Sequence, residues 1–364
     1  MSCWRIVLVL ALWLAGVGLA RADDDNGAGG AAPRIVRIQL KWTHQFQGAG
    51  FYAALEQGYF KDAGLDVRLL PGGPDIDPAQ VVAAGQAEFG VGNSSLLISR
   101  AWGAPVVAVA AIFQHSPFVL AVSRARGLDH PQDLEGRLVM LEAHAGELMA
   151  YLRRAGVDLS ALRQVPHNGD VHSLGHGIDA MSAYSSDEVY TLLTNKIAHQ
   201  IFNPRSLGLD FYGDTLFTSS SLAARDPALV RAVRDAVAKG WYYALDHTND
   251  MLRLITRRYA PDLDPLKLQF EADETRRLIE ADVVGIGYMN RRRWQSISDS
   301  FQQTGLIAAP VDLDEFLFET ARQDEAPRPW PIYALAAAGG VIVVLGGLCL
   351  MLLARLRGLR ARVG

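Results

Sequence analysis

Short β-rich runs alternate with helical patterns along residues 34–225, and this alternation limits the possible folds more than any other feature of the sequence. Several of the helical patterns end in glycine, the usual C-terminal stop of a helix. Strands that alternate with helices are typical of an α/β protein with largely parallel sheets. The predicted strands are residues 34–42, 66–70, 87–92, 105–113, 118–123, 137–141 and 180–185.

From Asp226 onward the pattern becomes helical, and each predicted helix begins near an Asp, Thr or Asn cap. We expect one ligand-binding domain over residues 34–320, divided into two α/β lobes. Lobe 1 is predicted to hold about residues 34–118 and 218–320, and lobe 2 about residues 119–217. Ligands of open α/β sheets bind beyond the carboxyl ends of the strands, so a cleft is the expected binding site. The predicted helices are residues 226–247, 248–260, 273–288 and 290–305.

The composition of the N-terminal residues indicates a targeting signal. Residues 1–22 have a basic start, an apolar run and a small-residue cleavage site, which predicts a secretory signal peptide. An uncleaved anchor helix is the alternative, although the apolar run is short for a bilayer span. Residues 23–33 are rich in Gly, Ala and Asp and are expected to form a linker.

The C-terminal residues predict a membrane anchor. Residues 332–354 are uncharged and would form a helix about 35 Å long, enough to cross a bilayer. Residues 321–331 would form a stalk, and the arginine-rich tail 355–364 would lie on the cytoplasmic side. The sequence therefore predicts a single-pass protein anchored on the periplasmic side of the cytoplasmic membrane. The tail is too short for a signalling domain, so a transporter permease or a separate sensor protein is the expected partner.

Charge and cysteine content exclude several functions. Six of the 35 Lys and Arg residues lie in the two end segments, so the remaining 29 face 39 acidic residues. Such an acidic body is a poor partner for nucleic acid. Cys3 and Cys349 both lie in the end segments, which leaves the predicted binding domain without disulfides, thiolate nucleophiles or cysteine-bound zinc.

A polar and aromatic group follows the first predicted strand, in the stretch "KWTHQFQG". Trp42, His44, Gln45 and Gln47 would lie at the carboxyl end of the strand, which is the lip of the expected cleft. An aromatic ring beside amide and imidazole groups suits a small heteroaromatic ligand. The alternative is a tryptophan packed under the loop with solvated polar neighbours.

Several segments resemble one known family. "LKWTHQFQGAGFYAALEQGYF", "FQHSP", "GIDAMSAYSSDEVY" and "YGDTLFTS" resemble the thiamine-pyrimidine-synthase-like, pyrimidine-precursor-binding group of type II periplasmic binding proteins. The resemblance covers residues 34–318 and is strongest to the subgroup that is usually fused to membrane sensor proteins. It implies a two-lobed clamshell that closes on a small pyrimidine-like molecule and needs no cofactor.

The resemblance also implies roles for particular residues. Trp42 would stack on the ligand ring, Asn93 and Ser94 would hydrogen-bond its polar edge, and Tyr184 and Glu188 would reach it from the other lobe. A carboxylate can form a charge-assisted pair with an aminopyrimidine.

The loop after residue 92 could also bind an anion by itself, because it ends a strand and caps a helix. Glu142 and Glu147 in the facing loop would repel an anion, which favours a neutral or cationic ligand. The predicted ligand-binding residues are Trp42, His44, Gln47, Asn93, Ser94, Glu142, Tyr184 and Glu188.

Some members of the wider family are enzymes that build the thiamine pyrimidine, and this is the alternative function. Those enzymes need a lysine and a histidine just after the third strand, where this chain has Gly92 and Leu96. Schiff-base chemistry requires an amine, so synthase activity is disfavoured. We therefore expect a binding protein rather than an enzyme, with no catalytic residues and no metal site.

Overall fold

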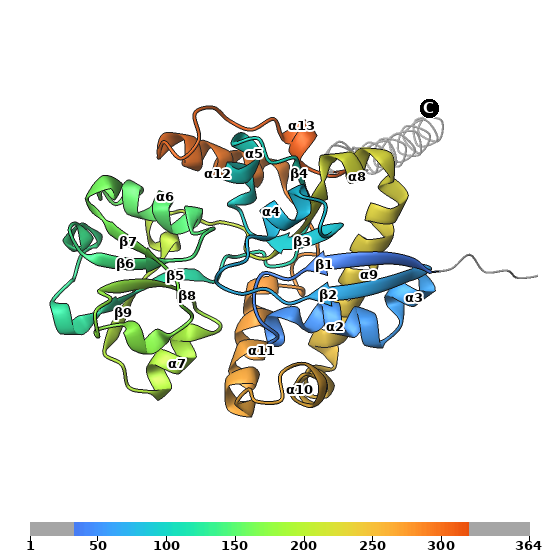
Figure 1. The fold of residues 1–364 in the computed structure, drawn as a ribbon, viewed down its shortest axis with the longest axis horizontal. Coiled ribbons are helices and arrows are strands. Elements are labelled where there is room, and N and C mark those ends of the chain that lie inside the picture. The colour runs from blue at the N-terminus through green and yellow to red at the C-terminus, as the bar shows by residue number, and fades with distance from the viewer. Residues whose placement is uncertain (1–32, 320–364) are drawn as a thin grey trace, which may run out of the picture. The chain divides into compact units, whose positions relative to one another are not determined.

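The computed structural model describes residues 33–319. Within this range, ten strands form two five-stranded sheets, and helices pack on both (Figure 1).

The first sheet has the strand order β2-β1-β3-β10-β4. β3 runs parallel to β1, with Ile38 opposite Phe89. β10 returns from the second lobe and pairs antiparallel with both β3 and β4. The strands are β1 Arg34–Gln39, β2 Leu65–Leu70, β3 Phe89–Gly92, β4 Val106–Ala111 and β10 Thr215–Ser219.

Both faces of the first sheet are buried, as the sequence of β4 shows. All six residues of "VVAVAA" are buried. Val106 and Ala108 belong to one core cluster, whereas Val107 and Val109 belong to another. A strand covered on both faces has no need of polar residues, so its sequence reads as a continuous apolar run.

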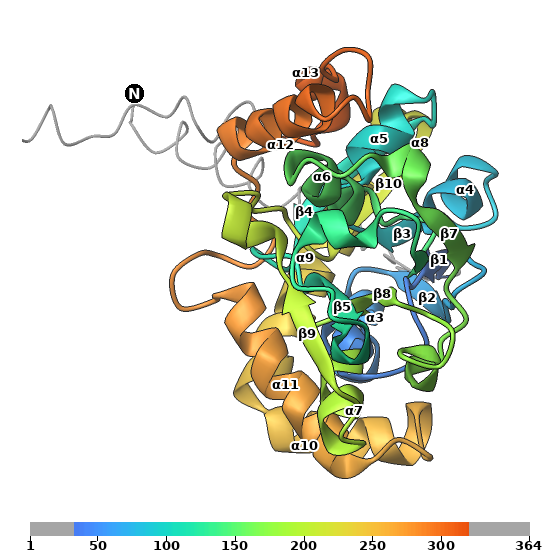
Figure 2. The ribbon, with the colours of Figure 1, turned by 90° about the vertical axis from the view of Figure 1, so that its left-hand side faces the viewer.

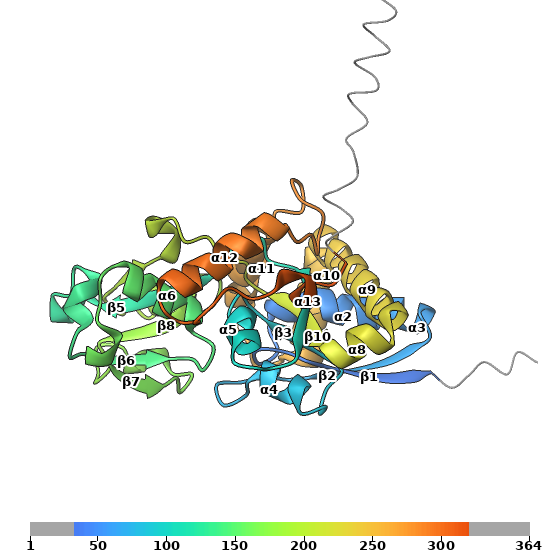
Figure 3. The ribbon, with the colours of Figure 1, turned by 90° about the horizontal axis from the view of Figure 1, so that it is seen from above.

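The first lobe contains most of the helices, and α2 and α9 pack against each other especially closely (Figure 3). A Cβ added to Gly240 of α9 would lie 2.0 Å from the backbone oxygen of Gly50 in α2. The α-helices are α2 Ala49–Glu56, α3 Tyr59–Asp62, α4 Pro78–Ala83, α5 Leu96–Ala101, α8 Ser220–Arg225, α9 Pro227–Asp246, α10 Thr248–Leu254, α11 Pro265–Ile279, α12 Arg291–Gln303 and α13 Leu313–Phe316. A 3-10 turn, η1 Phe46–Gly48, precedes α2, and a π-helical turn, η7 Ile255–Tyr259, follows α10.

The second sheet has the strand order β7-β6-β8-β5-β9. β6 runs parallel to β7 and β8, whereas β5 is antiparallel to β8 and β9. Figure 2 shows this lobe from its end, with α7 beside α11 of the first lobe. The strands are β5 Phe118–Ser123, β6 Leu138–Leu141, β7 Arg163–Pro166, β8 Ala180–Tyr184 and β9 His199–Phe202, and the α-helices are α6 Gly146–Arg154 and α7 Glu188–Thr194. The 3-10 turns are η2 Arg124–Arg126, η3 Pro131–Leu134, η4 Leu159–Ala161, η5 Val171–Ser173 and η6 Pro204–Leu207.

Both sheets are mixed, which corrects the expectation of largely parallel sheets. The chain leaves the first lobe after β4 and comes back before β10. The strands next to these two crossings, β5 and β10, pair antiparallel with their neighbours. The two crossing segments, residues 112–117 and 203–214, are the connections between the lobes.

The sequence predicts a single-pass protein that is anchored in the cytoplasmic membrane and has a cytoplasmic C-terminus. The structural finding contradicts this predicted location. Among residues 33–319, no helix combines the length and the apolar character that crossing a bilayer requires. The 20-residue helix α9, for example, carries Arg231, Arg234 and Lys239. The predicted span, residues 332–354, and the predicted signal peptide, residues 1–22, lie outside the described residues.

Candidate functional site

A pocket lies where the two lobes meet, and about 220 Å³ there, including space open to solvent, is not filled by protein atoms. The first lobe contributes the segment after β1, and the second lobe contributes the ends of β6 and β8 and the start of α7. The lining residues are Lys41, Trp42, Gln45, Gln47, Glu142, Tyr184, Asp187 and Glu188.

Hydrogen bonds and close backbone packing hold the segment after β1 in place. The Gln39 side-chain amide donates to the backbone oxygens of Leu40 and Pro71, at 3.0 and 2.9 Å. The Gly72 N–H donates to the Trp42 oxygen at 2.9 Å, and a Cβ on Gly72 would lie 2.4 Å from the Lys41 backbone carbon. Only glycine allows the two chain segments to approach this closely. The bend therefore directs Lys41 and Trp42 toward the second lobe.

Trp42 contacts that lobe through His167. The two rings meet edge to face, with centroids 6.1 Å apart and an interplanar angle of 79°. The His167 Nε2 atom lies 3.1 Å from the Ser182 backbone oxygen, and its Nδ1 accepts the Gly169 N–H. Burial lowers the pKa of His167, which keeps the ring neutral beside the indole.

Glu142 is the ionised carboxylate of the pocket. Burial opposes its ionisation, but the close contact with His144 and the charge of Lys41 outweigh that effect and lower the pKa of Glu142 to about 2. The His144 Nε2 atom lies 2.9 Å from a carboxylate oxygen of Glu142. Glu142 therefore presents a negative charge to the pocket at any pH near neutrality.

The start of α7 adds two more carboxyl groups. Asp187 forms an ion pair with Lys267 of α11, which links the second lobe to the first. Glu188 accepts the Tyr184 N–H at 2.8 Å. Burial, together with the nearby carboxylates Asp187 and Glu142, raises the pKa of Glu188 well above its usual value. Glu188 is therefore disposed to be a neutral acid that can donate as well as accept.

Lys41 lies against the aromatic residues of the second lobe. Its ammonium nitrogen is 4.2 Å from the centre of the Tyr184 ring and 4.9 Å from the centre of the Phe118 ring. Within residues 33–319, neither this nitrogen nor the Tyr184 hydroxyl has a hydrogen-bond partner. Both groups are buried, and both residues line the pocket.

A second hollow shares Lys41, Trp42 and Gln47 with the first and reaches Asp214. The Gln47 amide donates to Asp214 at 2.6 Å, and burial raises the pKa of Asp214 to about 6. Glu147, at the start of α6, accepts the Ser94 N–H at 3.2 Å and the Ser116 hydroxyl. Burial raises the pKa of Glu147 to about 7. Glu147 of the second lobe thus contacts Ser94 of the first lobe and Ser116 of a crossing segment, and Asp214 contacts Gln47 in the wall of the pocket.

The structure brings five of the eight predicted ligand-binding residues into the pocket. They are Trp42, Gln47, Glu142, Tyr184 and Glu188.

His44, Asn93 and Ser94 are not among the lining residues. His44 contacts the Tyr52 hydroxyl at 2.9 Å and the Tyr259 ring, on the side of the helical section. The Asn93 side chain accepts the Ser95 N–H, and the Ser94 hydroxyl donates to the backbone of Tyr212. These three polar groups stabilise the scaffold instead of facing the pocket.

Three lining residues are absent from the predicted ligand-binding set: Lys41, Gln45 and Asp187. Gln45 belongs to the polar group singled out in the sequence, whereas Asp187 lies within the segment GIDAMSAYSSDEVY without an assigned role. Lys41 directly precedes Trp42 at the end of a buried strand, and a charged residue in that position is the signal that could have identified it.

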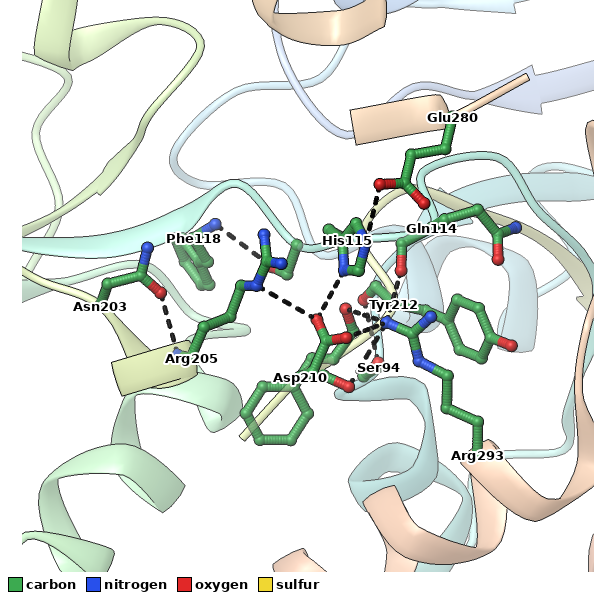
Figure 4. Close-up of polar contacts among 12 residues, drawn as sticks. Ser94, Gln114, His115, Phe118, Asn203, Arg205, Asp210, Tyr212, Glu280 and Arg293 are labelled. Atoms are coloured by element: carbon green, nitrogen blue, oxygen red, sulfur yellow. Dashed lines mark hydrogen bonds and ion pairs between the residues drawn. The ribbon is translucent and has the colours of Figure 1, made fainter. Parts of the chain in front are cut away.

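The crossing segments next to the pocket are tied together by charged side chains (Figure 4). His115 of the first crossing lies 2.7 Å from Asp210 of the second and 3.3 Å from Glu280 at the end of α11. Arg293 of α12 forms an ion pair with Asp210 at 3.1 Å and lies over the Tyr212 ring. This network joins both connections to the helical section of the first lobe.

The chain has the two-lobed fold of periplasmic binding proteins, a class of proteins that bind small solutes. The features that define this fold are the two α/β lobes, the polar pocket between them and the paired crossing segments. Residues 45–250, more than half of the chain, match the family described as NMT1/THI5 like. The chain belongs to this family, which confirms the family resemblance found in the sequence, whereas the likeness to a sensor-fused subgroup stays a prediction.

Two proteins of similar sequence are named for the small molecules that they bind. The chain is 23% identical to a formylaminopyrimidine-binding protein of Halalkalibacterium halodurans, over 75% of this chain and 85% of that protein. It is 22% identical to the riboflavin-binding protein RibY of Chloroflexus aurantiacus, over 81% of this chain and 89% of that protein. Among solved structures, the ligand-binding component of an ABC-type import system from Staphylococcus aureus has the same fold. Its TM-score is 0.59 at 14% identity, over 81% of this chain and 99% of that one.

Proposed function

We propose that this protein binds a small heteroaromatic ligand of the aminopyrimidine type between its lobes and passes it to a membrane transporter. The observation that carries the proposal is the joining of Trp42 from the first lobe with Glu142 and Glu188 from the second in one pocket. The first lobe supplies the indole but no carboxyl group of this pocket, whereas the second lobe supplies the carboxyl groups but not the indole. A ligand that contacts both would therefore require the closed form.

The chemistry of these groups matches an aminopyrimidine. The indole of Trp42 offers a flat surface on which an aromatic ring can stack. The ionised Glu142 can accept a hydrogen bond from an exocyclic amino group, and this charge-assisted bond is stronger than a neutral one. Glu188, as a neutral acid, can donate to a ring nitrogen. The formylaminopyrimidine-binding and riboflavin-binding relatives support a heteroaromatic ligand.

The alternative, a pyrimidine synthase, has less support. Gly92 ends β3, and Leu96 packs so closely that a Cβ on Gly92 would lie 3.0 Å from it. Neither residue can supply the amine that such chemistry needs. Transfer of the ligand to a transporter is favoured over sensing because a solved structure with the same fold is a component of an ABC-type import system.

Calorimetric titration of the purified full chain tests the proposed ligand class. The probes are an aminopyrimidine with a hydroxymethyl group, its formylamino relative and riboflavin, with benzyl alcohol as the reference that lacks ring nitrogens and an amino group. We expect at least one heteroaromatic probe to bind with a Kd of about 1 μM or tighter. Binding of aliphatic sulfonates or amino acids with no binding of any heteroaromatic probe would contradict the proposal. Uptake of the labelled ligand by cells that lack this chain tests the transport role, and undiminished uptake would exclude it.

A further inference from the structure

We propose that Lys41 and Tyr184 form a subsite for an oxygen acceptor, so that the ligand carries a carbonyl or carboxylate oxygen in addition to the amino edge that faces Glu142. This inference rests on the proposed function and narrows the ligand class. It makes Lys41, a residue outside the predicted set, a determinant of specificity.

The first support is the lack of any acceptor for two buried donors. Lys41 is only 3% exposed, and Tyr184 is 6% exposed. Within residues 33–319, the Lys41 ammonium and the Tyr184 hydroxyl have no hydrogen-bond partner. An ammonium has three N–H donors, and leaving buried donors unpaired is costly. An acceptor on the ligand would remove this cost only when the ligand is bound.

The second support is the position of the two groups. Both residues line the same pocket as Trp42 and Glu142. The rings of Tyr184 and Phe118 lie against the ammonium, and this contact stabilises the positive charge but accepts no conventional hydrogen bond. The charge is thus held in place while its N–H groups stay available.

The third support is the charge balance around the pocket. Asp187 is paired with Lys267, and the Glu142 carboxylate is in contact with His144. The pKa values of Glu147 and Asp214 are raised by burial, to about 7 and about 6, so both groups carry negative charge near neutral pH, but among the described residues neither accepts a hydrogen bond from the Lys41 ammonium. The pocket therefore contains a positive group, Lys41, and a negative group, Glu142. A ligand that carries both an oxygen acceptor and an amino group can pair with each of them.

The alternative explanation is that Lys41 only balances the charge of buried carboxyl groups. Its positive charge does favour the ionised forms of Glu142, Glu147 and Asp214. A purely balancing role predicts that replacing Lys41 weakens all ligands equally, because it would act through stability. An acceptor subsite predicts that the loss depends on the substituent of the ligand.

The test uses matched aminopyrimidine probes that carry a carboxylate or an aminomethyl group at the same ring position, and the corresponding benzene compounds. Calorimetry compares the full-length wild type with Lys41→Met, Tyr184→Phe and a control, Lys61→Met, at an exposed lysine of α3. We expect the wild type to prefer the carboxylate probe by about tenfold or more, and Lys41→Met to lose that preference. Tyr184→Phe should reduce it less, and Lys61→Met should leave it unchanged.

Formate provides a readout that does not depend on the ring. At equal ionic strength, formate should raise the melting temperature of the wild type and of Lys61→Met above the value in chloride, but not that of Lys41→Met. If no ring-bearing probe binds but the formate effect still requires Lys41, the proposed function is rejected and the acceptor subsite is supported. A wild-type preference for the aminomethyl probe, or a formate effect that is absent or independent of Lys41, would overturn the subsite. If Lys41→Met does not fold, Tyr184→Phe decides, and an unchanged carboxylate preference in that variant rejects the subsite.

Discussion

At the residue scale, the pocket is built by a few side chains whose neighbours fix their chemistry. Glu142 and Glu188 are both buried glutamates, yet one is stabilised as an anion and the other as a neutral acid. The difference arises from position, because Glu142 has His144 and Lys41 nearby, whereas Glu188 has two carboxylates. The two glutamates therefore differ in role: Glu142 is a hydrogen-bond acceptor, and Glu188 can be a hydrogen-bond donor.

Trp42 is expected to supply much of the affinity for an aromatic ligand. Trp42→Ala should weaken binding of the aminopyrimidine probes by about tenfold to a hundredfold, because stacking of a base on an aromatic side chain contributes about 1–3 kcal/mol. Trp42→Phe should restore part of the loss. Trp102 is 78% exposed and does not line the pocket, so Trp102→Ala is the matched control. Equal affinities of Trp42→Ala and the wild type in calorimetry would remove the indole from the proposed site.

Glu147 should make the stability of the protein depend on pH. Its pKa is raised by burial to about 7, so the folded protein binds more protons than the unfolded chain between about pH 4.5 and 7. The contribution of Glu147 to stability is complete below pH 4.5 and is lost as the pH rises through 7. This loss corresponds to about 3 kcal/mol at pH 8.

Glu147→Gln should abolish that pH dependence, because glutamine keeps the shape of the side chain and can hydrogen-bond to Ser94 and Ser116 without a charge. Denaturant unfolding at pH 5 and pH 8 measures the difference in the free energy of unfolding. The control is Asp262→Asn at an exposed carboxyl group, which should follow the wild type. A wild type and a Glu147→Gln variant with parallel pH profiles would contradict the raised pKa.

The sequence identified several of the pocket-lining residues because these residues lie next to each other in motifs. Trp42 and Gln47 follow a strand end, and Tyr184 and Glu188 lie in one short segment, so their elements could be placed. His44 could not be assigned, since the Phe46 N–H donates to Glu271 of α11 and fixes a turn that directs His44 toward Tyr52. Such a contact joins residues 225 positions apart and has no local signal.

At the element scale, burial explains some outcomes of the strand prediction but not all, because β10 was not predicted although four of its five residues are buried. The predicted strand 180–185 corresponds to β8, in which all five residues are buried. β7 and β9 were missed because most of their residues are exposed or half-buried, which leaves little hydrophobic pattern. The helix predicted from residue 273 begins eight residues earlier, at Pro265, and it ends where Glu280 adopts a left-handed conformation with φ 52°.

The close contact of α2 and α9 makes a sharp prediction about stability. Gly240→Ala should lower the free energy of unfolding by about 1–3 kcal/mol or more, because the new methyl group would meet the Gly50 backbone, which cannot move aside freely. Gly73→Ala is the control, since a Cβ there meets nothing within 4 Å and the position requires no positive φ. Chemical denaturation measures both variants. Equal stability of the two would show that α2 and α9 can separate at little cost.

At the scale of the whole molecule, the described conformation is closed, and contacts on several sides of the pocket hold the lobes together. On one side, Asp187 pairs with Lys267 and Tyr190 packs on Phe270. On another, the Ser95 hydroxyl donates to the His144 backbone oxygen. The crossing segments, tied by Asp210 to Arg293, remain as the connection about which the lobes would open. Ligand binding can shift the balance of open and closed forms only by its differential affinity for the two.

The ion pair between Asp187 and Lys267 should therefore control closure. Asp187 is 5% exposed, so Lys267→Met would leave a buried carboxylate without its partner in the closed form, at a cost of about 3 kcal/mol. In the open form the carboxylate can reach water, so the cost should appear as opening and not as unfolding. Affinity for the aminopyrimidine probes should fall at least about tenfold, with faster dissociation.

Spin labels placed at exposed Lys61 and Arg163, with Cys3 and Cys349 replaced by serine, measure the distance between the lobes. Lys267→Met should shift the distances to larger values, and adding Asp187→Asn should partly reverse the shift because the uncompensated charge is removed. Arg277→Met is the control, since Arg277 pairs with Glu274 inside α11 and crosses no cleft. Identical distance distributions for Lys267→Met and Arg277→Met would mean that the ion pair does not hold the lobes together, and closure would then depend on the pocket itself.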